Sequence, residues 1–459
     1  MLRLHDTATG TVRALEPRHE GAVSMYVCGA TVYDLPHVGH GRFALIWDVV
    51  RRYLEWSGFS VRFVSNVTDI DDKIIKRAEE EGRRPDEVAQ QGETVWYHAM
   101  DALGIGRPDA DPHATAFIGP MVELIAALVE AGIAYETDDG VYFAVESVEG
   151  YGLLARQSLE SLRSGARIEV DEHKRSPLDF VLWKRAKPGE PSWDTPWGPG
   201  RPGWHTECVV MALDLLGEGF DLHGGGIDLA FPHHENERAQ AVALGRDFAH
   251  HWTHSGLVVA PGGEKMSKSL GNFTSLTDLL SRTDPRAYRL LVLRSHYRAP
   301  MEVQPTNVAD AEAALGRLDN VLRRAAEIDL PVGAAEPDPE SLGRFRAFMD
   351  DDLDTPRAMA LVFELVRRAN SALDTEDDAT AAALLAALGE ITAAVGLGPA
   401  VEAGAEPVPE EVTALARRRD EARAARDWQA ADAARDEIVA LGWSVEDTAR
   451  GTKVRPPRS

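Results

Sequence analysis

The first hundred residues combine strand-like and helical patterns of hydrophobic positions. Residues 23–28 (VSMYVC) are apolar at nearly every position, which is typical of a parallel strand covered on both faces. Apolar residues at helical spacing follow from 43 to 54, and a second strand pattern occupies 60–65. Together these segments predict a β-α-β unit with ligand chemistry in the loop after the first strand.

Strand patterns return further along the chain. A short strand at 220–222 leads into three consecutive glycines at 224–226, which we expect to form a ligand-facing loop because glycine has no Cβ. Residues 252–260 form another predicted strand, and helical patterns dominate beyond Thr274. The chain is therefore predicted to be an α/β fold with a Rossmann-like parallel sheet, followed by an all-α helical bundle and a small C-terminal domain.

Composition indicates several ordinary globular domains. The 459 residues are 44% hydrophobic and 27% charged, in the usual range for soluble proteins. No segment approaches the roughly 18 apolar residues that a membrane span needs, and the N-terminus MLRLHDTATG lacks the pattern of a secretory signal. We therefore expect a cytoplasmic protein without membrane association.

The charge is distributed unevenly. The formal net charge is −25, which argues against a protein that coats nucleic acid nonspecifically. Residues 411–459 carry ten Lys/Arg against nine Asp/Glu, a net of +1, so the preceding 410 residues carry −26. The C-terminal tail is therefore the part best suited to approach a polyanion.

Two histidine- or lysine-containing motifs suit phosphate binding. His37 and His40 in PHVGH lie one helical turn apart, so both imidazoles can face one anion beside a helix N-terminus. Lys265 and Lys268 in KMSKS lie in a glycine-flanked loop and suit the charge of a triphosphate. Taken singly, each motif also fits a role without phosphate binding: PHVGH as a structural pair of histidines, and KMSKS as a solvated loop.

The stretch HGGGIDLAFPHHENE, residues 223–237, combines a glycine turn with candidate metal ligands. Asp228 can accept hydrogen bonds from ribose hydroxyls, or can simply cap the turn. His233 and Glu237 are four residues apart and share a helix face, whereas His234 is three residues from Glu237. The residues alone do not decide between the two histidines.

Cys28 and Cys208 are the two cysteines of the chain. Two cysteines exclude a disulfide framework, and a cytosolic protein would keep them reduced. Each lies ahead of one of the proposed nucleotide motifs. Each cysteine is by default a small buried residue, but thiolate and imidazole are ligands that Zn²⁺ prefers, so the two could also hold a metal.

These motifs together resemble a known family. HVGH at 37–40 and KMSKS at 265–269 look like the two motifs of class I aminoacyl-tRNA synthetases. MYVCGATVYD, NVTDIDDKIIKRA, DFVLWK, GRPGWHTECVV, FPHHENE and EKMSKSLGNF are similar to the cysteinyl-tRNA synthetase family, as are RDW and ADAARDEI near the C-terminus. The resemblance covers almost the whole chain.

The resemblance implies a domain plan. It comprises a Rossmann-like catalytic domain in two halves, 1–115 and 204–274, separated by a connective insertion at 116–203. The second half holds the metal and KMSKS motifs. A helical bundle at 275–396, a linker at 397–410 and an anticodon-binding region at 411–459 would follow.

The resemblance also implies one zinc ion per chain, held by Cys28, Cys208, His233 and Glu237. Cysteine and serine differ by one atom, and an apolar pocket separates such near-isosteres only about 10- to 200-fold. A zinc ion with an exchangeable position would instead select the substrate thiolate. The residues expected around the substrate cysteine are Thr68, Trp204 and His234.

The implied reaction is ATP-dependent ligation of cysteine to tRNA(Cys). L-Cysteine and ATP would form cysteinyl-adenylate and pyrophosphate, and the terminal adenosine of tRNA would then accept cysteine on its 2′-hydroxyl. No side chain is an obvious nucleophile, so positioning and electrostatics would carry catalysis. The catalytic residues implied are His37, His40, Lys265 and Lys268, and ATP with Mg²⁺ would contact His37, His40, Gly224, Asp228 and Lys268.

The tail is expected to contact tRNA. Basic residues beside aromatics suit phosphate contacts and stacking on unpaired bases. The alternative is a solvated helix with ion pairs such as Arg417–Glu421 and Arg423–Asp427. The predicted tRNA-binding residues are Arg417, Arg418, Arg423 and Trp428, and we expect the protein to act as a monomer.

Two other functions fit part of the pattern. A cysteine ligase of mycothiol biosynthesis resembles the same catalytic domain but would transfer cysteine to glucosaminyl-inositol, an acceptor that needs no tail beyond Pro409. A noncatalytic RNA-binding zinc protein would not need both His37/His40 and Lys265/Lys268, because binding alone requires no triphosphate apparatus.

Overall fold

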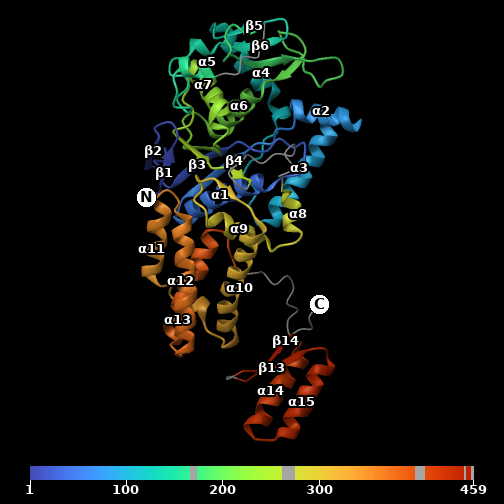
Figure 1. Cartoon of the computed structure of the whole chain (residues 1–459), viewed down its shortest axis with the longest axis vertical. Helices are drawn as coiled ribbons and strands as arrows, with labels where there is room; N and C mark the ends of the chain where they lie inside the picture. The colour runs from blue at the N-terminus through green and yellow to red at the C-terminus, as the bar shows by residue number, and fades with distance from the viewer. Residues whose placement is uncertain (166–172, 261–273, 399–408, 449–450, 456–459) are drawn as a thin grey trace. The chain divides into compact units, whose positions relative to one another are not determined.

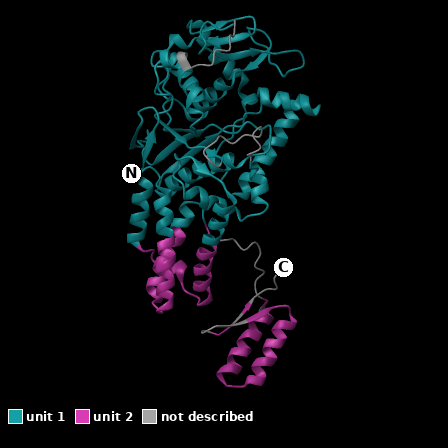
Figure 2. Ribbon diagram, in the orientation of Figure 1, with its two compact units in different colours: residues 1–315, 339–362, 391–397 teal, residues 316–338, 363–390, 398–459 magenta. Residues whose placement is uncertain are grey.

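The computed structural model describes residues 1–165, 173–260, 274–398, 409–448 and 451–455. These residues form two compact units, coloured separately in Figure 2. Unit 1 comprises 1–315, 339–362 and 391–397, and unit 2 comprises 316–338, 363–390 and 398–459.

A four-stranded parallel sheet in the order β10-β9-β3-β4 forms the centre of unit 1 (Figure 1). Its strands are β3 (Ala22–Val27), β4 (Ser60–Ser65), β9 (Leu222–Gly226) and β10 (His251–Ser255). β3, β9 and β10 are buried at nearly every position, as expected for parallel strands covered on both faces. The predicted Rossmann-like sheet is confirmed.

Helices cover this sheet on both sides. α1 (Val38–Trp56) connects β3 to β4, and α6 (Trp204–Leu216) precedes β9; in Figure 1 the two helices lie on opposite sides of the sheet. The loop after β4 leads into α2 (Asp72–Glu81) and α3 (Pro85–Ala102), and α7 (Glu235–Ala243) connects β9 to β10. The carboxyl ends of β3 and β9 therefore lie beside the N-termini of α1 and α7.

The three glycines at 224–226 differ from expectation, because they belong to strand β9 and do not form a loop. A Cβ on Gly224 would lie 2.5 Å from the Trp47 ring, and one on Gly225 would lie 2.4 Å from His234. Packing of α1 and of His234 against the strand therefore requires glycine at both positions.

A second sheet occupies the segment expected to be an insertion. It is antiparallel in the order β5-β6-β7-β8. Hydrophobic residues of this segment, such as Met121 on a helix and Phe143 in the sheet, share one core with Tyr26 and Val64 of the parallel sheet. The elements are η1 (Ala114–Phe117), α4 (Ile118–Glu130), β5 (Ala134–Glu136), β6 (Gly140–Phe143), η2 (Val145–Ser147), α5 (Leu159–Gly165), β7 (Phe180–Arg185) and β8 (Gly200–Pro202).

Beyond residue 274 the described chain is predominantly helical, as predicted. The helices are α8 (Leu276–Leu280), α9 (Pro285–Leu293), α10 (Pro305–Glu327), α11 (Pro339–Asp350), α12 (Thr355–Asp374) and α13 (Asp378–Ala394), with a short 3₁₀ turn, η5 (Val332–Ala334). Two small sheets complete unit 1: β1 (Arg3–Asp6) with β2 (Thr11–Ala14), and β11 (Val258–Val259) with β12 (Met301–Glu302).

The C-terminal piece contains two helices and a hairpin. α14 (Glu410–Ala424) and α15 (Trp428–Ala440) agree with the predicted tail helices, whereas the antiparallel pair β13 (Ser444–Thr448) and β14 (Gly451–Arg455) was not predicted. Val412, Leu415, Ile438 and Trp443 form its small core. Trp443 is thus a packing residue.

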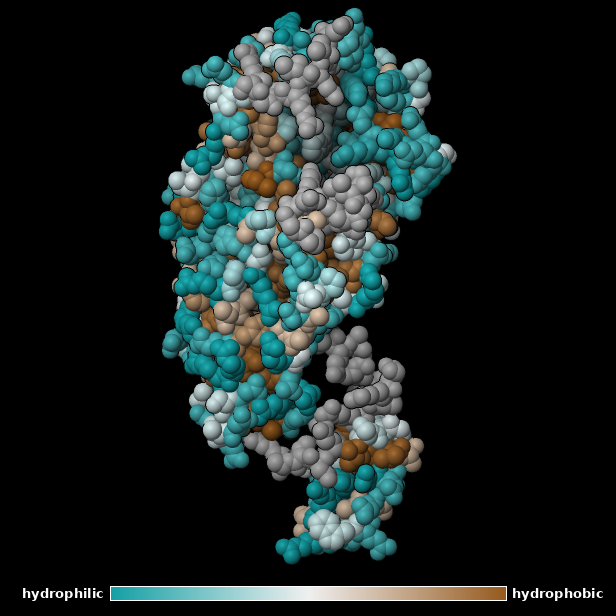
Figure 3. Space-filling view, viewed as in Figure 1, coloured by the Kyte–Doolittle hydropathy of each residue, from teal (hydrophilic) through white to brown (hydrophobic). Residues whose placement is uncertain are grey.

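Hydrophobic residues on the face shown in Figure 3 form small patches separated by hydrophilic ones. Over the described ranges, no helix combines the length and apolar character needed to cross a bilayer.

Candidate metal centre and substrate site

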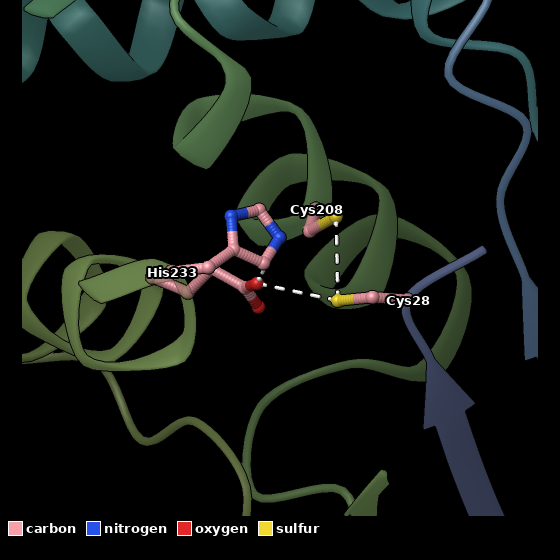
Figure 4. A group of neighbouring side chains, drawn as sticks. Cys28, Cys208 and His233 are labelled. Carbon is pink, nitrogen blue, oxygen red and sulfur yellow. Dashed lines mark hydrogen bonds and ion pairs between the residues drawn. The ribbon is translucent and has the colours of Figure 1, made fainter. Parts of the chain in front are cut away.

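The four predicted metal ligands converge in unit 1. Cys28 follows β3, Cys208 lies on α6, His233 lies in the turn η3 (Ala230–His234), and Glu237 lies on α7. All four are buried, and one ligand atom from each lies within 4.8 Å of the others. Figure 4 shows the two sulfurs and the His233 ring directed toward a common centre.

The distances within this group fit a metal site better than a self-contained hydrogen-bond cluster. The sulfurs of Cys28 and Cys208 are 3.6 Å apart, far beyond the length of a disulfide. His233 Nε2 lies 2.9 Å from Glu237 Oε1, yet this buried nitrogen has no hydrogen-bond partner of acceptable geometry in the described chain. An orphaned buried nitrogen beside two thiols and a carboxylate suits a tetrahedral Zn²⁺ site.

The electrostatics of the group favour a thiolate at one position. Burial opposes ionisation of Cys208, but a hydrogen bond from Cys28 and the proximity of His233 lower its pKa to about 6. Burial and the neighbouring Cys208 raise the pKa of Cys28 well above its usual value. Despite burial, Glu237 raises the pKa of His233 to about 9.

A second group of candidate ligands shares two members with the first. Cys28, His223, His234 and Glu237 also bring their ligand atoms within 4.8 Å. His223 Nε2 lies 2.7 Å from Glu237 Oε2, and His234 Nε2 lies 3.3 Å from Cys28 Sγ. The structure therefore brings both His233 and His234 to the centre and leaves two alternative ligand sets.

Further histidines extend this cluster away from the metal centre. His234 Nδ1 lies 2.8 Å from His254 Nε2, and His254 Nδ1 lies 2.7 Å from Thr7 Oγ1. Burial lowers the pKa of His254 to about 3 and that of His234 well below its usual value, which disfavours the charged form of both rings. Sequence reasoning missed His223 and His254, because no local spacing links them to the cysteines.

The residues predicted around the substrate cysteine border the centre. The Trp204 ring stacks on His233 with centroids 3.9 Å apart. Trp204 is 37% exposed, whereas Thr68 is 1% exposed. The Thr68 hydroxyl lies 3.3 Å from Glu207 Oε2. Burial raises the pKa of Glu207 well above its usual value, and the nearby Cys208, Asp71 and Asp69 add to this. Glu207 was not predicted from the sequence.

The two histidines of HVGH open helix α1. His37 is its N-cap, and the backbone N–H groups of His40 and His37 each donate to Nδ1 of the other residue at 3.4 Å. The rings stack with centroids 3.8 Å apart. Because each Nδ1 acts as an acceptor in these contacts, Nε2 is the nitrogen of each ring that can carry a proton. The helix N-terminus thus carries two N–H donors suited to an anion.

For the other residues predicted to bind the nucleotide, the structure gives at most a position. Gly224 lies in β9 against Trp47, as described above, and Asp228 is exposed just beyond that strand. Lys265 and Lys268 lie outside the described residues.

The predicted tRNA contacts lie on α14 and at the start of α15. Arg417 and Arg418 are exposed, Arg423 is half-buried and Trp428 is 62% exposed. Arg418 pairs with Glu437 of α15. Within residues 409–448 the structure shows no ion pair between Arg417 and Glu421.

Comparison with known protein families matches three successive segments of the chain. Residues 14–313 match the family of tRNA synthetases class I (C) catalytic domains, residues 344–398 match the DALR domain, and residues 405–455 match the cysteinyl-tRNA ligase anticodon binding domain.

Full-length relatives agree with this assignment. The chain is 46% identical to a cysteine–tRNA ligase of Pectobacterium carotovorum, over 98% of this chain and 99% of the relative. It is 45% identical to one of Haemophilus influenzae, over 99% of this chain and 100% of the relative.

Solved structures support the fold. The methionyl-tRNA synthetase of Mycobacterium tuberculosis in complex with methionyl-adenylate aligns over 82% of this chain and 90% of its own, with a TM-score of 0.60 and 16% identity. The leucyl-tRNA synthetase of Agrobacterium radiobacter aligns over 83% and 85%, with a TM-score of 0.62 and 12% identity. With its family matches and its full-length relatives, the chain belongs to the cysteine–tRNA ligase family of class I aminoacyl-tRNA synthetases.

Proposed function

We propose that this protein activates L-cysteine with ATP and transfers it to the 3′ end of tRNA(Cys). The observation that carries the proposal is the convergence of Cys28, Cys208, His233 and Glu237 in a chain of this family. The same chain opens helix α1 with His37 and His40. In the first step a cysteine carboxylate oxygen attacks the α-phosphorus of ATP and pyrophosphate leaves. In the second, a ribose hydroxyl of the tRNA attacks the adenylate carbonyl and AMP leaves.

The metal would be Zn²⁺, one per chain, held by Cys28, Cys208, His233 and Glu237. When bound, it would supply a soft Lewis-acid position that takes the substrate thiolate and refuses a serine hydroxyl. The orphaned His233 Nε2 and the sulfur-containing donor set support this choice. Trp204, stacked on His233, would close the substrate pocket, with Thr68 and His234 as further contacts.

The histidines of α1 would bind the phosphates of ATP. Their Nε2–H groups and the helix N-terminus would stabilise negative charge as pyrophosphate leaves. Mg²⁺ would accompany ATP, and Lys265 and Lys268, proposed from the sequence alone, would neutralise the same charge. Gly224 and Asp228 complete the proposed nucleotide contacts.

The domain boundaries, the location and the assembly state belong to the same proposal. The segments 1–115, 116–203, 204–274, 275–396, 397–410 and 411–459 would act as the two catalytic halves, insertion, bundle, linker and anticodon-binding region. Two unpaired buried thiols suit the reducing cytoplasm. We propose a monomer, which light scattering coupled to size-exclusion chromatography would test.

One assay series tests the activity. Cysteine-dependent exchange of pyrophosphate into ATP is expected without tRNA, followed by transfer of cysteine to tRNA(Cys) when tRNA competes with glucosaminyl-inositol. Absence of exchange would contradict adenylate formation, and transfer to the amino sugar alone would replace tRNA as acceptor. The match of residues 405–455 to an anticodon-binding domain supports tRNA.

A further inference from the structure

The substrate of the proposed reaction carries three polar groups, and one still lacks a partner in the site. The thiol would meet the metal and the carboxylate would meet ATP, but the α-ammonium has no assigned acceptor. A buried cation is stable only when a carboxylate or several oxygen acceptors compensate it. This inference rests on the proposed function and concerns that acceptor.

Glu207 lies where such an acceptor is needed. It occupies α6 three residues after Trp204, so the two side chains are neighbours on the helix surface. Its carboxylate is 1% exposed, and Oε2 lies 3.3 Å from the hydroxyl of Thr68. Glu207 thus connects the two residues proposed, on other grounds, to contact the substrate.

A hydrogen-bond chain fixes the orientation of these groups. Asn66 Nδ2 donates to the Thr68 hydroxyl at 3.2 Å, so the proton of that hydroxyl is directed to Glu207. The Asn66 oxygen accepts from the backbone N–H of Gly29 at 2.8 Å, beside Cys28. These hydrogen bonds therefore fix the position of the Glu207 carboxylate relative to the metal centre.

The other carboxylates near the site already have partners. Glu237 faces His223 and His233. Asp72 pairs with Lys184 and Arg201.

Two more aspartates are also engaged. Asp69 accepts from the backbone and hydroxyl of Thr115, and Asp71 caps α2.

Glu207 differs from these groups in having no cationic partner among the described residues. Its only hydrogen bond there is to Thr68, and no ion pair reaches it. Within the described ranges it also belongs to no group of three metal-ligating atoms within 4.8 Å. A compact organic cation that brings its own hydrogen-bond donors fits this surrounding better than a metal ion.

We propose that Glu207 accepts the α-ammonium of cysteine, with the Thr68 hydroxyl oxygen as a second acceptor. Glu207 is then a specificity-determining residue, which distinguishes an amino acid from other small thiols. The metal would recognise the thiol, and Glu207 recognises the amino group.

Binding of three thiols to the full-length protein tests this assignment. L-Cysteine has all three groups, 3-mercaptopropionate lacks the ammonium, and cysteamine lacks the carboxylate. Isothermal titration calorimetry is performed on wild type, on Glu207→Gln, which keeps the shape and an acceptor for Thr68, and on Glu190→Gln. Glu190 is a largely buried carboxylate of the insertion, with an 11% exposed side chain, and serves as the matched control.

Glu207→Gln is expected to weaken cysteine and cysteamine about 10- to 100-fold, the usual value of a hydrogen bond to a charged group. Binding of 3-mercaptopropionate and the metal content should not change, and Glu190→Gln should bind all three thiols like wild type. Equal weakening of all three thiols by Glu207→Gln, or no weakening, would overturn the proposal. Failure of the proposed function is distinguishable, because wild type itself would then show no cysteine-dependent pyrophosphate exchange.

Discussion

His233 Nε2 lies 2.9 Å from Glu237 Oε1, one helical turn further along the chain, without forming a hydrogen bond of acceptable geometry. Two buried ligand atoms at this distance, both directed at the same point, are the arrangement expected of two ligands of one cation. Substitution of the groups around this pair tests whether they hold a metal ion.

Replacing a thiol should remove the metal. Cys208→Ser is expected to lower zinc from about one ion per chain to a small fraction, because a hydroxyl is a far weaker zinc ligand than a thiolate. Preference for cysteine over serine should fall toward the roughly 10- to 200-fold that a pocket alone provides. Plasma emission spectroscopy measures the first effect and pyrophosphate exchange the second. The exposed His19→Ala is the control, and full metal retention in Cys208→Ser would disprove the ligand set.

Substitution of His233 and substitution of His234 should have different effects on the metal content. His233→Ala is expected to lose the ion, whereas His234→Asn should retain it and lose affinity for cysteine. The reverse result would assign the ion to the second group, Cys28, His223, His234 and Glu237. Metal analysis and cysteine titration on the same samples distinguish the two sets.

The tail should bind tRNA through its exposed basic helix. Arg417→Glu is expected to weaken tRNA binding and to reduce its dependence on salt, because phosphate contacts release counterions. Trp428→Ala should weaken binding by about 1–3 kcal/mol if the ring stacks on a base, and Trp428→Phe should restore most of it. Exchange of pyrophosphate without tRNA serves as the internal control. If the tail does not contact tRNA, the dissociation constants of these variants for tRNA will equal that of wild type.

A buried ion pair in unit 1 should matter for stability. Arg289 of α9 lies 2.6 Å from Asp48 of α1, and both side chains are 2% exposed. Arg289→Met would leave the buried Asp48 with the half-exposed Arg52 and the backbone N–H of Gly106 as partners, and should lower the free energy of unfolding by about 3–5 kcal/mol. Arg246→Met, which removes an exposed pair with Glu218, should cost less than about 1 kcal/mol. Urea denaturation followed by tryptophan fluorescence measures the free energy of unfolding of both variants. A similar loss in the two would contradict a special role of the buried pair.

The pair of His113 and Glu93 should make stability depend on pH. Burial opposes protonation of His113, but the hydrogen bond with Glu93, at 3.1 Å, raises its pKa above 6.5. The folded state therefore binds this proton more tightly than the unfolded chain. The stabilisation is fully present below about pH 6.5 and is lost as the pH rises through the folded pKa. Melting temperatures of wild type and Glu93→Gln should differ at about pH 5.5 and converge at higher pH; a constant difference would refute the linkage.

The sequence by itself determined the β-α-β unit, the helical second part and the residue types of the metal centre. These features are local. The apolar run at 23–28 is typical of a buried strand, and the structure has a strand at Ala22–Val27. The two cysteines carry their metal-binding chemistry in their identity. The i,i+4 relation of His233 and Glu237 also follows from helix geometry alone, and the ion pair observed between them agrees with it.

The tertiary structure decided which distant groups meet. Cys28 and Glu237 lie 209 positions apart, yet their side chains approach to 3.3 Å because parallel strands bring their carboxyl ends to one edge. Only the fold shows that Gly224 is needed against Trp47 within a strand, that His223 offers a second ligand set, and that Glu207 faces Thr68. No sequence spacing encodes these contacts, since each depends on how separate elements pack.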